Sequence, residues 1–307
     1  MNISKIHRTF ISGWLVFILC MFAFLAFRLQ GDWTEINLWV CTLLQIAAAL
    51  LLLLLNGAFS LIRNRTFLPA IFYLLLTGWN PIFHYDLVGS ITTLAITLNY
   101  LLLFNTYQKR NSQFNAFNIS LILLLGGFFH PTLLLFLPLF WIGFYWLWSL
   151  NLRTFLASLI AIVSIYWIGF AWSIYRQDWS IFLILLPNLE DVFFVNMLSL
   201  SYYEWIGFGI VSLILIFAGL NLFVLSSSEK LQTGVFFKFL YVSACIFLLL
   251  SLAQSEYRAY WGAIAYIPVS LIFAHYFTLT NQLIIKFLML LFIFSFWWLG
   301  YLHNFPA

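Results

Sequence analysis

Long apolar runs separated by short polar turns form the main pattern of this chain. A single crossing of a membrane by a helix takes about 20 apolar residues, and most of the runs have about this length. The runs are continuously apolar, whereas the strands of a membrane β-barrel alternate between apolar and polar residues. The pattern predicts an all-α, polytopic helical membrane protein. The expected single domain spans 1–307, with about eleven transmembrane helices at 10–27, 38–62, 67–83, 87–107, 115–130, 132–148, 155–175, 205–225, 235–253, 261–279 and 284–302.

The run from Asn118 to Trp148, NISLILLLGGFFHPTLLLFLPLFWIGFYWLW, is too long for one crossing. It contains no Asp, Glu, Lys or Arg, but two glycines and His130-Pro131 fall near its middle. Because proline cannot continue the hydrogen bonding of a helix, the run should break there. We expect a helical hairpin with its tip at His130-Pro131 and a second arm that bends at Pro138.

Composition narrows the class of protein further. Hydrophobic residues make up 64% of the 307 residues and charged residues 7%, whereas soluble domains carry about 25% charged residues. The mean hydropathy is +1.04. The net charge of +4 comes from basic residues scattered through short turns, so it does not indicate nucleic-acid binding. The three cysteines lie within apolar runs and are interpreted as small buried residues, not as a disulfide or metal cluster.

The distribution of charge predicts how the chain is threaded. With the N-terminus inside, ten of the 13 basic residues fall in cytoplasmic turns, as the positive-inside rule requires. These ten are Lys5, Arg8, Arg63, Arg65, Lys109, Arg110, Arg153, Lys230, Lys238 and Lys286. Of the nine acidic residues, only Glu229 falls inside. We therefore expect an N-in, C-out topology, with the first apolar run retained as a helix and not cleaved as a signal peptide.

The longest connection, 176–204, is expected on the outer side. Its two apolar halves suit one or two interfacial helices on the outer leaflet. The alternative is a loop that packs over the helices as a lid. Its aromatic residues are typical of anchoring at a membrane interface.

The segment from Thr66 through Gly143 resembles the core of the GT-C superfamily of polyprenyl-phosphate-dependent membrane glycosyltransferases. The order of features is similar: a helix that ends in a proline turn, FLPAIFYLLLTGWNP; an outer turn with an aspartate, HYDLVGSITTLAITLNYLLLF; a basic inner turn, QKR; and ISLILLLGGFFHPTLLLFLPLF. The whole chain also resembles a family of uncharacterised bacterial inner-membrane proteins. The resemblance implies multi-pass location in the bacterial inner (cytoplasmic) membrane.

The GT-C resemblance implies a catalytic acidic residue in the first outer loop and a second in the next loop. Asp32 or Glu35 matches the first position, and Asp86 with His84 the second. A carboxylate in a low-dielectric cavity can act as a general base toward an acceptor hydroxyl. The candidate substrate-binding residues are His84, His130, Arg28, Arg176 and Arg258, of which the arginines could pair with a lipid phosphate. The first loop departs from the family pattern because Asp32 and Glu35 do not form an adjacent pair.

Each candidate also has a structural explanation. Solvation alone accounts for Asp32 and Glu35 in an outer turn, Asp86 could cap the following helix, and His130 could satisfy helix ends at the hairpin tip. No pattern indicates haem, flavin or nucleotide binding, and a divalent metal is implied only by the resemblance. Two classes of function remain. One is a GT-C-like transferase or lipid-linked saccharide handler with a polyprenyl-phosphate partner; the other is a non-catalytic accessory protein that binds lipid or another protein.

Overall fold

The computed structural model describes residues 14–29, 34–62, 66–179, 200–224, 231–279 and 283–304. The described residues form eleven α-helices and two 3-10 helices, with no strand among them. The α-helices are α2 (Trp14–Arg28), α3 (Ile36–Phe59), α4 (Leu68–Gly78), α5 (Leu87–Phe104), α6 (Gln113–Gly127), α7 (Leu137–Trp146), α8 (Leu152–Arg176), α11 (Tyr202–Val224), α12 (Leu231–Ala253), α13 (Arg258–Leu279) and α14 (Leu283–Asn304). The 3-10 helices are η1 (Pro81–Phe83) and η2 (Pro131–Phe136).

The observed helices coincide with the eleven predicted segments. Six of them are long and apolar enough to cross a membrane, and five more are shorter apolar helices. The prediction of a helical membrane protein is therefore supported. Two boundaries differ clearly. The segment predicted at 132–148 becomes α-helical only at Leu137, after η2, and the segment predicted at 67–83 ends as an α-helix at Gly78 and continues as η1. Pro81 has no backbone N–H to donate, and the Asn80 side chain accepts a hydrogen bond from the Ile82 N–H, so a separate short turn begins there.

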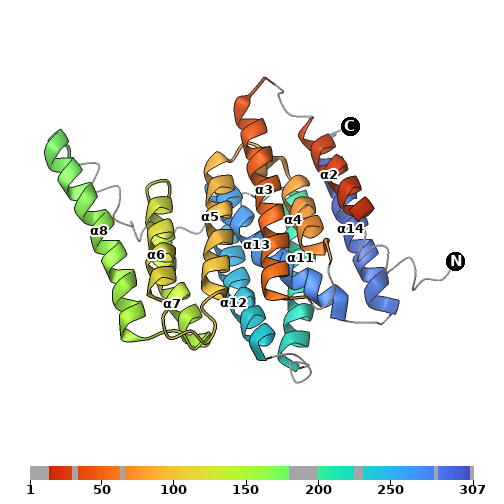
Figure 1. Cartoon of the computed structure of the whole chain (residues 1–307). Helices are drawn as coiled ribbons and strands as arrows, with labels where there is room; N and C mark the ends of the chain where they lie inside the picture. The colour runs from red at the N-terminus through yellow and green to blue at the C-terminus, as the bar shows by residue number, and fades with distance from the viewer. Residues whose placement is uncertain are drawn as a thin grey trace. The chain divides into compact units, whose positions relative to one another are not determined.

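The chain divides into two compact units, which are described separately. Unit 1 comprises Met1–Leu94 and Asn196–Ala307, and unit 2 comprises Ala95–Val195. In unit 1, α4 packs against α2, α3, α13 and α14 (Figure 1). Every residue of α4 is buried, as expected for a helix that is apolar on all sides. The core of unit 1 is thus built around a helix of only 11 residues.

Two glycines of α11 offer a test of this packing. A Cβ atom on Gly207 would lie 2.6 Å from the Trp79 ring, whereas a Cβ on Gly209 would meet nothing within 4 Å. Trp79 is buried and cannot move aside without disturbing the core. We expect Gly207→Ala to lower the free energy of unfolding by about 2 kcal/mol through overpacking. Gly209→Ala in the same helix is the control and should be neutral or slightly stabilising; equal melting temperatures in detergent for the two variants would contradict this account.

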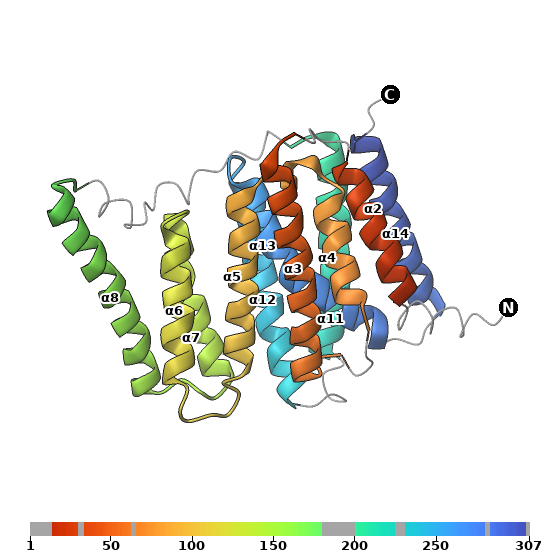
Figure 2. The ribbon, with the colours of Figure 1, turned by 45° about the horizontal axis from the view of Figure 1, so that its top comes forward.

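In unit 2, the hairpin predicted from the sequence is present. α6 ends at Gly127, His130 is extended, and η2 and α7 follow as the second arm (Figure 2). A Cβ on Gly126 would lie 2.7 Å from Leu133, so the glycine allows the two arms to approach closely at the tip. The second arm begins with six residues of 3-10 helix and becomes α-helical only at Leu137. Because Pro138 cannot donate to the carbonyl one turn earlier, the winding changes at this point.

The outer helix of unit 2 is α8, which packs against α6 (Figure 2). Small or short side chains on one face of α8 are buried, and a core of Leu124, Leu134, Ala161 and Ile165 fills the contact. The Trp141 indole N–H also donates to the Ser158 hydroxyl at 3.0 Å. Most of the segment predicted as interfacial, 176–204, lies outside the described residues.

Candidate functional site

Buried charges in the described part of the chain gather in unit 1 around the connection between α4 and α5, residues 79–86. The buried charged side chains among the described residues are Arg28, Glu204 and Arg258. Charged groups are costly to place inside a membrane protein and are retained where they form specific structures or sites. This cluster is therefore the leading candidate for a functional site.

Two short polar side chains shape the α4–α5 connection. Asn80 caps η1 by accepting the Ile82 N–H at 3.0 Å. Asp86 caps α5, because its Oδ1 accepts the Gly89 N–H at 2.8 Å. Asparagine and aspartate are preferred at such positions because they satisfy backbone donors that the helix leaves without partners. The structural role expected for Asp86 as a helix cap is thus observed.

Arg28 holds this connection from the C-terminal end of α2. Its guanidinium donates to the carbonyl oxygens of His84 at 2.8 Å and Phe83 at 3.2 Å. It also donates to the side-chain oxygen of Gln45, on α3. Among the described residues, no carboxylate pairs with Arg28. The cation is instead stabilised by neutral oxygens and by the Phe24 ring, whose centroid lies 5.0 Å from Cζ.

Gln45 completes this part of the cluster. Its amide N–H₂ donates to the Phe83 carbonyl at 3.0 Å and to the Ser90 hydroxyl at 3.3 Å. One buried amide thus links α2, the α4–α5 connection and α5. An interhelical hydrogen bond of this kind is the role expected for an amide within an apolar helix.

Glu204 holds the other side of the connection. Its Oε1 accepts the Asn80 side-chain N–H at 3.2 Å, and its Oε2 lies 3.4 Å from Nη1 of Arg258, at the start of α13. Ser201 and Glu204 also form a capping box at the start of α11. The Glu204 N–H donates to the Ser201 hydroxyl at 3.3 Å, and the Ser201 N–H donates to Oε2 at 2.9 Å.

Aromatic rings surround this part of the cluster. The centroid of the His303 ring lies 6.1 Å from that of Trp79 and 5.6 Å from that of Tyr203. Phe83 packs edge-on against Tyr266, with centroids 5.5 Å apart. These rings lower the local dielectric constant and so strengthen the interaction between the charged groups that they surround.

The environment shifts the protonation of two groups in the connection. Burial, together with the nearby positive charge of Arg28, lowers the pKa of His84 to about 3, so this imidazole is neutral at physiological pH. Its Nε2 is 3.4 Å from the Gly78 carbonyl. Burial raises the pKa of Asp86 above its ordinary value, and the hydrogen bond from Gly89 opposes that shift. The second carboxylate oxygen of Asp86, Oδ2, is buried and accepts no hydrogen bond from the described residues.

The cluster therefore has two properties relevant to chemistry. Its buried charges comprise two arginines and one glutamate, which favours an anion nearby. Asp86 supplies a carboxylate oxygen that no described group occupies. Among the described residues, no group of three His, Cys, Asp or Glu side chains is placed to hold a metal ion.

The other predicted site residues are distributed more widely. Asp32 lies outside the described residues. Glu35 is exposed at the start of α3 and makes no capping hydrogen bond. His130 and Arg176 belong to unit 2, where the His130 ring is 2.6 Å from the Thr132 hydroxyl and Arg176 lies over the Trp172 ring. Of the predicted site residues, Arg28, His84, Asp86 and Arg258 lie in unit 1. His84 and Asp86 belong to the α4–α5 connection, Arg28 holds one side of it, and Arg258 lies on the other side.

Three residues of the cluster were not among the predicted site residues: Gln45, Asn80 and Glu204. Glu204 had a sequence signal, because Ser201-x-x-Glu204 before an apolar run is the pattern of a capping box. No comparable local pattern marks Asn80 as the partner of a glutamate 124 positions away.

Comparison with known proteins identifies no matching family model, curated protein or solved structure. The functional interpretation consequently depends on the chemistry of the cluster and on the sequence pattern of the segment from Thr66 through Gly143.

Proposed function

We propose that the protein is a GT-C-like membrane glycosyltransferase or lipid-linked saccharide handler whose site is the α4–α5 connection of unit 1. The expected donor is a sugar carried on a polyprenyl phosphate. Asp86 would act as the general base that accepts the proton of the acceptor hydroxyl. Arg28, which pairs with no carboxylate among the described residues, would supply positive charge for the phosphate of the donor.

The observation that carries this proposal is the environment of Asp86. One oxygen of its carboxylate caps α5, which fixes the orientation of the group, and the other oxygen is buried without a described donor. A carboxylate whose orientation is fixed and whose pKa is raised is a stronger base than an ordinary aspartate, which suits it to proton transfer. Arg28 donates to the carbonyl of His84, two positions before Asp86 in the sequence, and is a buried cation that no described carboxylate neutralises.

We also propose a location and an orientation for the protein in the membrane. With the N-terminus inside and eleven crossings, the α4–α5 connection faces the extracytoplasmic side of the bacterial inner membrane. The ends of α2 and α12 and the starts of α3, α11 and α13 would lie on the same side. The positive-inside distribution of the sequence supports this orientation.

Asp86→Asn separates catalysis from capping, because asparagine caps helices as well as aspartate does but cannot accept a proton. We expect it to reduce sugar release from polyprenyl-phosphate hexoses by at least about 100-fold with an unchanged melting temperature. The assay uses purified protein in nanodiscs with a panel of polyprenyl-phosphate hexoses as donors and a panel of sugar and lipid alcohols as acceptors. It measures the polyprenyl phosphate released as the sugar passes to the acceptor hydroxyl. In the wild type, the rate should fall as the pH decreases through the raised pKa of Asp86, where the base becomes protonated.

Two further variants complete this test. Asp86→Ala should lose both the activity and about 1 kcal/mol of stability, because it removes the cap as well as the base. Glu256→Gln, which changes an exposed carboxylate outside the predicted site residues, serves as the control for a change of charge. Wild-type release rates in Asp86→Asn, or no release from any donor by the wild type, would overturn the transferase proposal.

A second candidate function is supported by a different observation. Both terminal nitrogens of Arg28 and both carboxylate oxygens of Glu204 already have partners within the chain. That arrangement suits a non-catalytic membrane accessory protein, in which the cluster only fixes the α4–α5 connection. Such a protein would bind lipid or a protein partner, and the activity of its cellular process would be insensitive to Asp86→Asn.

A further inference from the structure

We propose that one end of unit 2 is a preformed binding surface for the headgroups of anionic phospholipids. The surface consists of two turns, one between α5 and α6 (residues 105–112) and one between α7 and α8 (residues 147–151), with the first turn of α8. We refer to it as the paired-turn surface. It lies in the other unit of the chain from the site proposed above, and its function does not depend on that site.

Hydrogen bonds join the two turns directly. The Gln108 N–H donates to the Leu147 carbonyl at 2.9 Å, and the Asn151 side chain donates to the Arg110 carbonyl at 2.7 Å. Beneath them lies a buried group of hydroxyls. The Thr106 and Ser149 hydroxyls are 3.0 Å apart, and those of Ser112 and Thr154 are 2.9 Å apart. The two turns therefore form one connected structure.

The backbone of both turns is also held in an unusual conformation. Gln108 and Trp148 adopt left-handed φ angles of 56° and 59°. Residues other than glycine stay in this region only where their surroundings hold them there. The buried hydroxyls and the bonds between the turns provide that constraint. The groups displayed on the surface are consequently positioned before any ligand binds.

The paired-turn surface carries three cations without a counter-charge. Lys109, Arg110 and Arg153 are exposed. The sequence contains no Asp or Glu from Leu87 to Gln177, and the single ion pair among the described residues lies elsewhere. The Lys109 ammonium donates to a neutral partner, the Asn105 side-chain oxygen, at 2.8 Å. The bond from Asn151 to the Arg110 carbonyl keeps Arg110 beside the turn that leads to Arg153.

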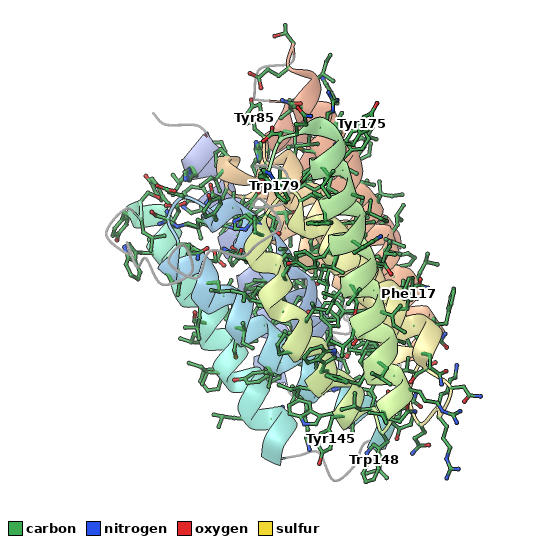
Figure 3. The ribbon with its side chains drawn as sticks, turned by 90° about the vertical axis from the view of Figure 1, so that its left-hand side faces the viewer. Tyr85, Phe117, Tyr145, Trp148, Tyr175 and Trp179 are labelled. Atoms are coloured by element: carbon green, nitrogen blue, oxygen red, sulfur yellow. The ribbon has the colours of Figure 1, made fainter. Side chains whose placement is uncertain are left out.

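Exposed aromatic rings accompany these cations. Trp148 is 79% exposed and Tyr145 is 70% exposed. Figure 3 shows both at one end of unit 2, opposite the end marked by Tyr175 and Trp179. Tryptophan and tyrosine are enriched at the level of lipid headgroups, where one part of the ring contacts apolar chains and the polar atom contacts water. Trp148 is part of the paired-turn surface. A ring at headgroup level therefore places the three cations of this surface near the headgroup phosphates.

These features indicate an anionic lipid as the ligand. Arginine and lysine bind phosphate oxygens with charge-assisted hydrogen bonds, and basic pockets at helix ends bind anionic headgroups. A zwitterionic lipid has the same phosphate but also a cation that the three basic residues would repel. The surface should therefore prefer phosphatidylglycerol to phosphatidylcholine.

Native mass spectrometry of the full chain in detergent, with each of these two lipids titrated separately, tests this preference. We expect the wild type to bind phosphatidylglycerol on the order of 10- to 100-fold more tightly. The triple variant Lys109→Gln/Arg110→Gln/Arg153→Gln should bind both lipids equally. The control triple variant Arg63→Gln/Arg65→Gln/Lys238→Gln removes the same charge from other parts of the chain and should keep the preference.

Loss of the preference in the first triple variant only, with an unchanged melting temperature, would establish the surface. Retention of the preference in that variant would overturn the proposal. Equal losses in both triple variants would also overturn it, because they would show attraction to net charge and not to this surface. A wild type that does not distinguish the two lipids would have the same consequence.

Discussion

Arg28→Ala is expected to lower the free energy of unfolding by roughly 3 kcal/mol. The change removes the donor to the His84 carbonyl and to the Gln45 side-chain oxygen, which then remain buried without that donor. Each unsatisfied buried acceptor costs about 1–3 kcal/mol. The Phe83 carbonyl keeps its second donor, Gln45, so its loss is smaller. The variant no longer has to bury a cation, and this saved desolvation cost offsets part of the cost of the two unsatisfied acceptors. The expected net loss therefore lies in the middle of the range that two such acceptors give.

Arg176→Ala is the matched control for this change. Both arginines are the last residue of a helix, and both lie over an aromatic ring. They differ in burial, because Arg28 is 2% exposed and Arg176 is an exposed residue. The control should cost less than about 1 kcal/mol, the usual value of a cation at a helix C-terminus. Unfolding by sodium dodecyl sulfate in mixed micelles measures both; similar costs would show that Arg28 does not hold the connection.

Arg28 also illustrates how far the sequence determined the site. The pattern of apolar runs located the helices, because an apolar run of sufficient length has few alternatives to helix in a membrane. The distribution of basic residues predicted that Arg28 lies in an outer turn, where it was a candidate for binding phosphate. The structure buries it in the protein, where it binds two carbonyl oxygens some 55 residues away in sequence. No periodicity within α2 encodes which carbonyls those are.

Asp86 shows the opposite case. Its capping role followed from a local rule, since an aspartate directly before an apolar helical run is a favoured N-cap. The Gly89 N–H that it binds is three residues away. Local rules of this kind can be read from the sequence. The burial of the second carboxylate oxygen depends on the packing of unit 1, and such long-range contacts leave no local pattern.

The hairpin of unit 2 lies between these cases. Proline and glycine restrict the backbone locally, so the tip at His130-Pro131 was predictable. The six residues of 3-10 helix before α7 were not predictable; the bend was predicted at Pro138, which is the second residue of α7. In this arm Leu133 and Leu134 lie against Gly126 and Gly127 of α6, and no local sequence pattern encodes such contacts between the arms.

The second large effect is expected at the pair formed by Glu204 and Arg258. Glu204→Gln keeps the size of the side chain and its place in the capping box, which accepts glutamine, but removes the negative charge. Arg258 would then be a buried cation, 4% exposed, without its carboxylate. Breaking a buried ion pair from one side typically costs 3–5 kcal/mol. The separation of 3.4 Å is longer than in the strongest pairs, so we expect about 3 kcal/mol.

A double-mutant cycle identifies the origin of this loss. Arg258→Met alone should also be strongly destabilising, because it leaves the carboxylate buried without its cation. The double variant Glu204→Gln/Arg258→Met removes both charges and should be less destabilised than the sum of the single variants by at least about 2 kcal/mol. Ser201→Ala is the control, since it breaks only the capping box and should cost about 1 kcal/mol.

Additive single costs in that cycle would mean that the two charges do not interact, and Glu204 would then act only through its cap and Asn80. A coupled result would instead show that the ion pair fixes α11 to α13 beside the α4–α5 connection. Because Asn80 in that connection donates to the same carboxylate, the pair would also limit where Asp86 can lie. The stability of the Glu204 variants and the activity of the Asp86 variants therefore report on one structure through two independent measurements.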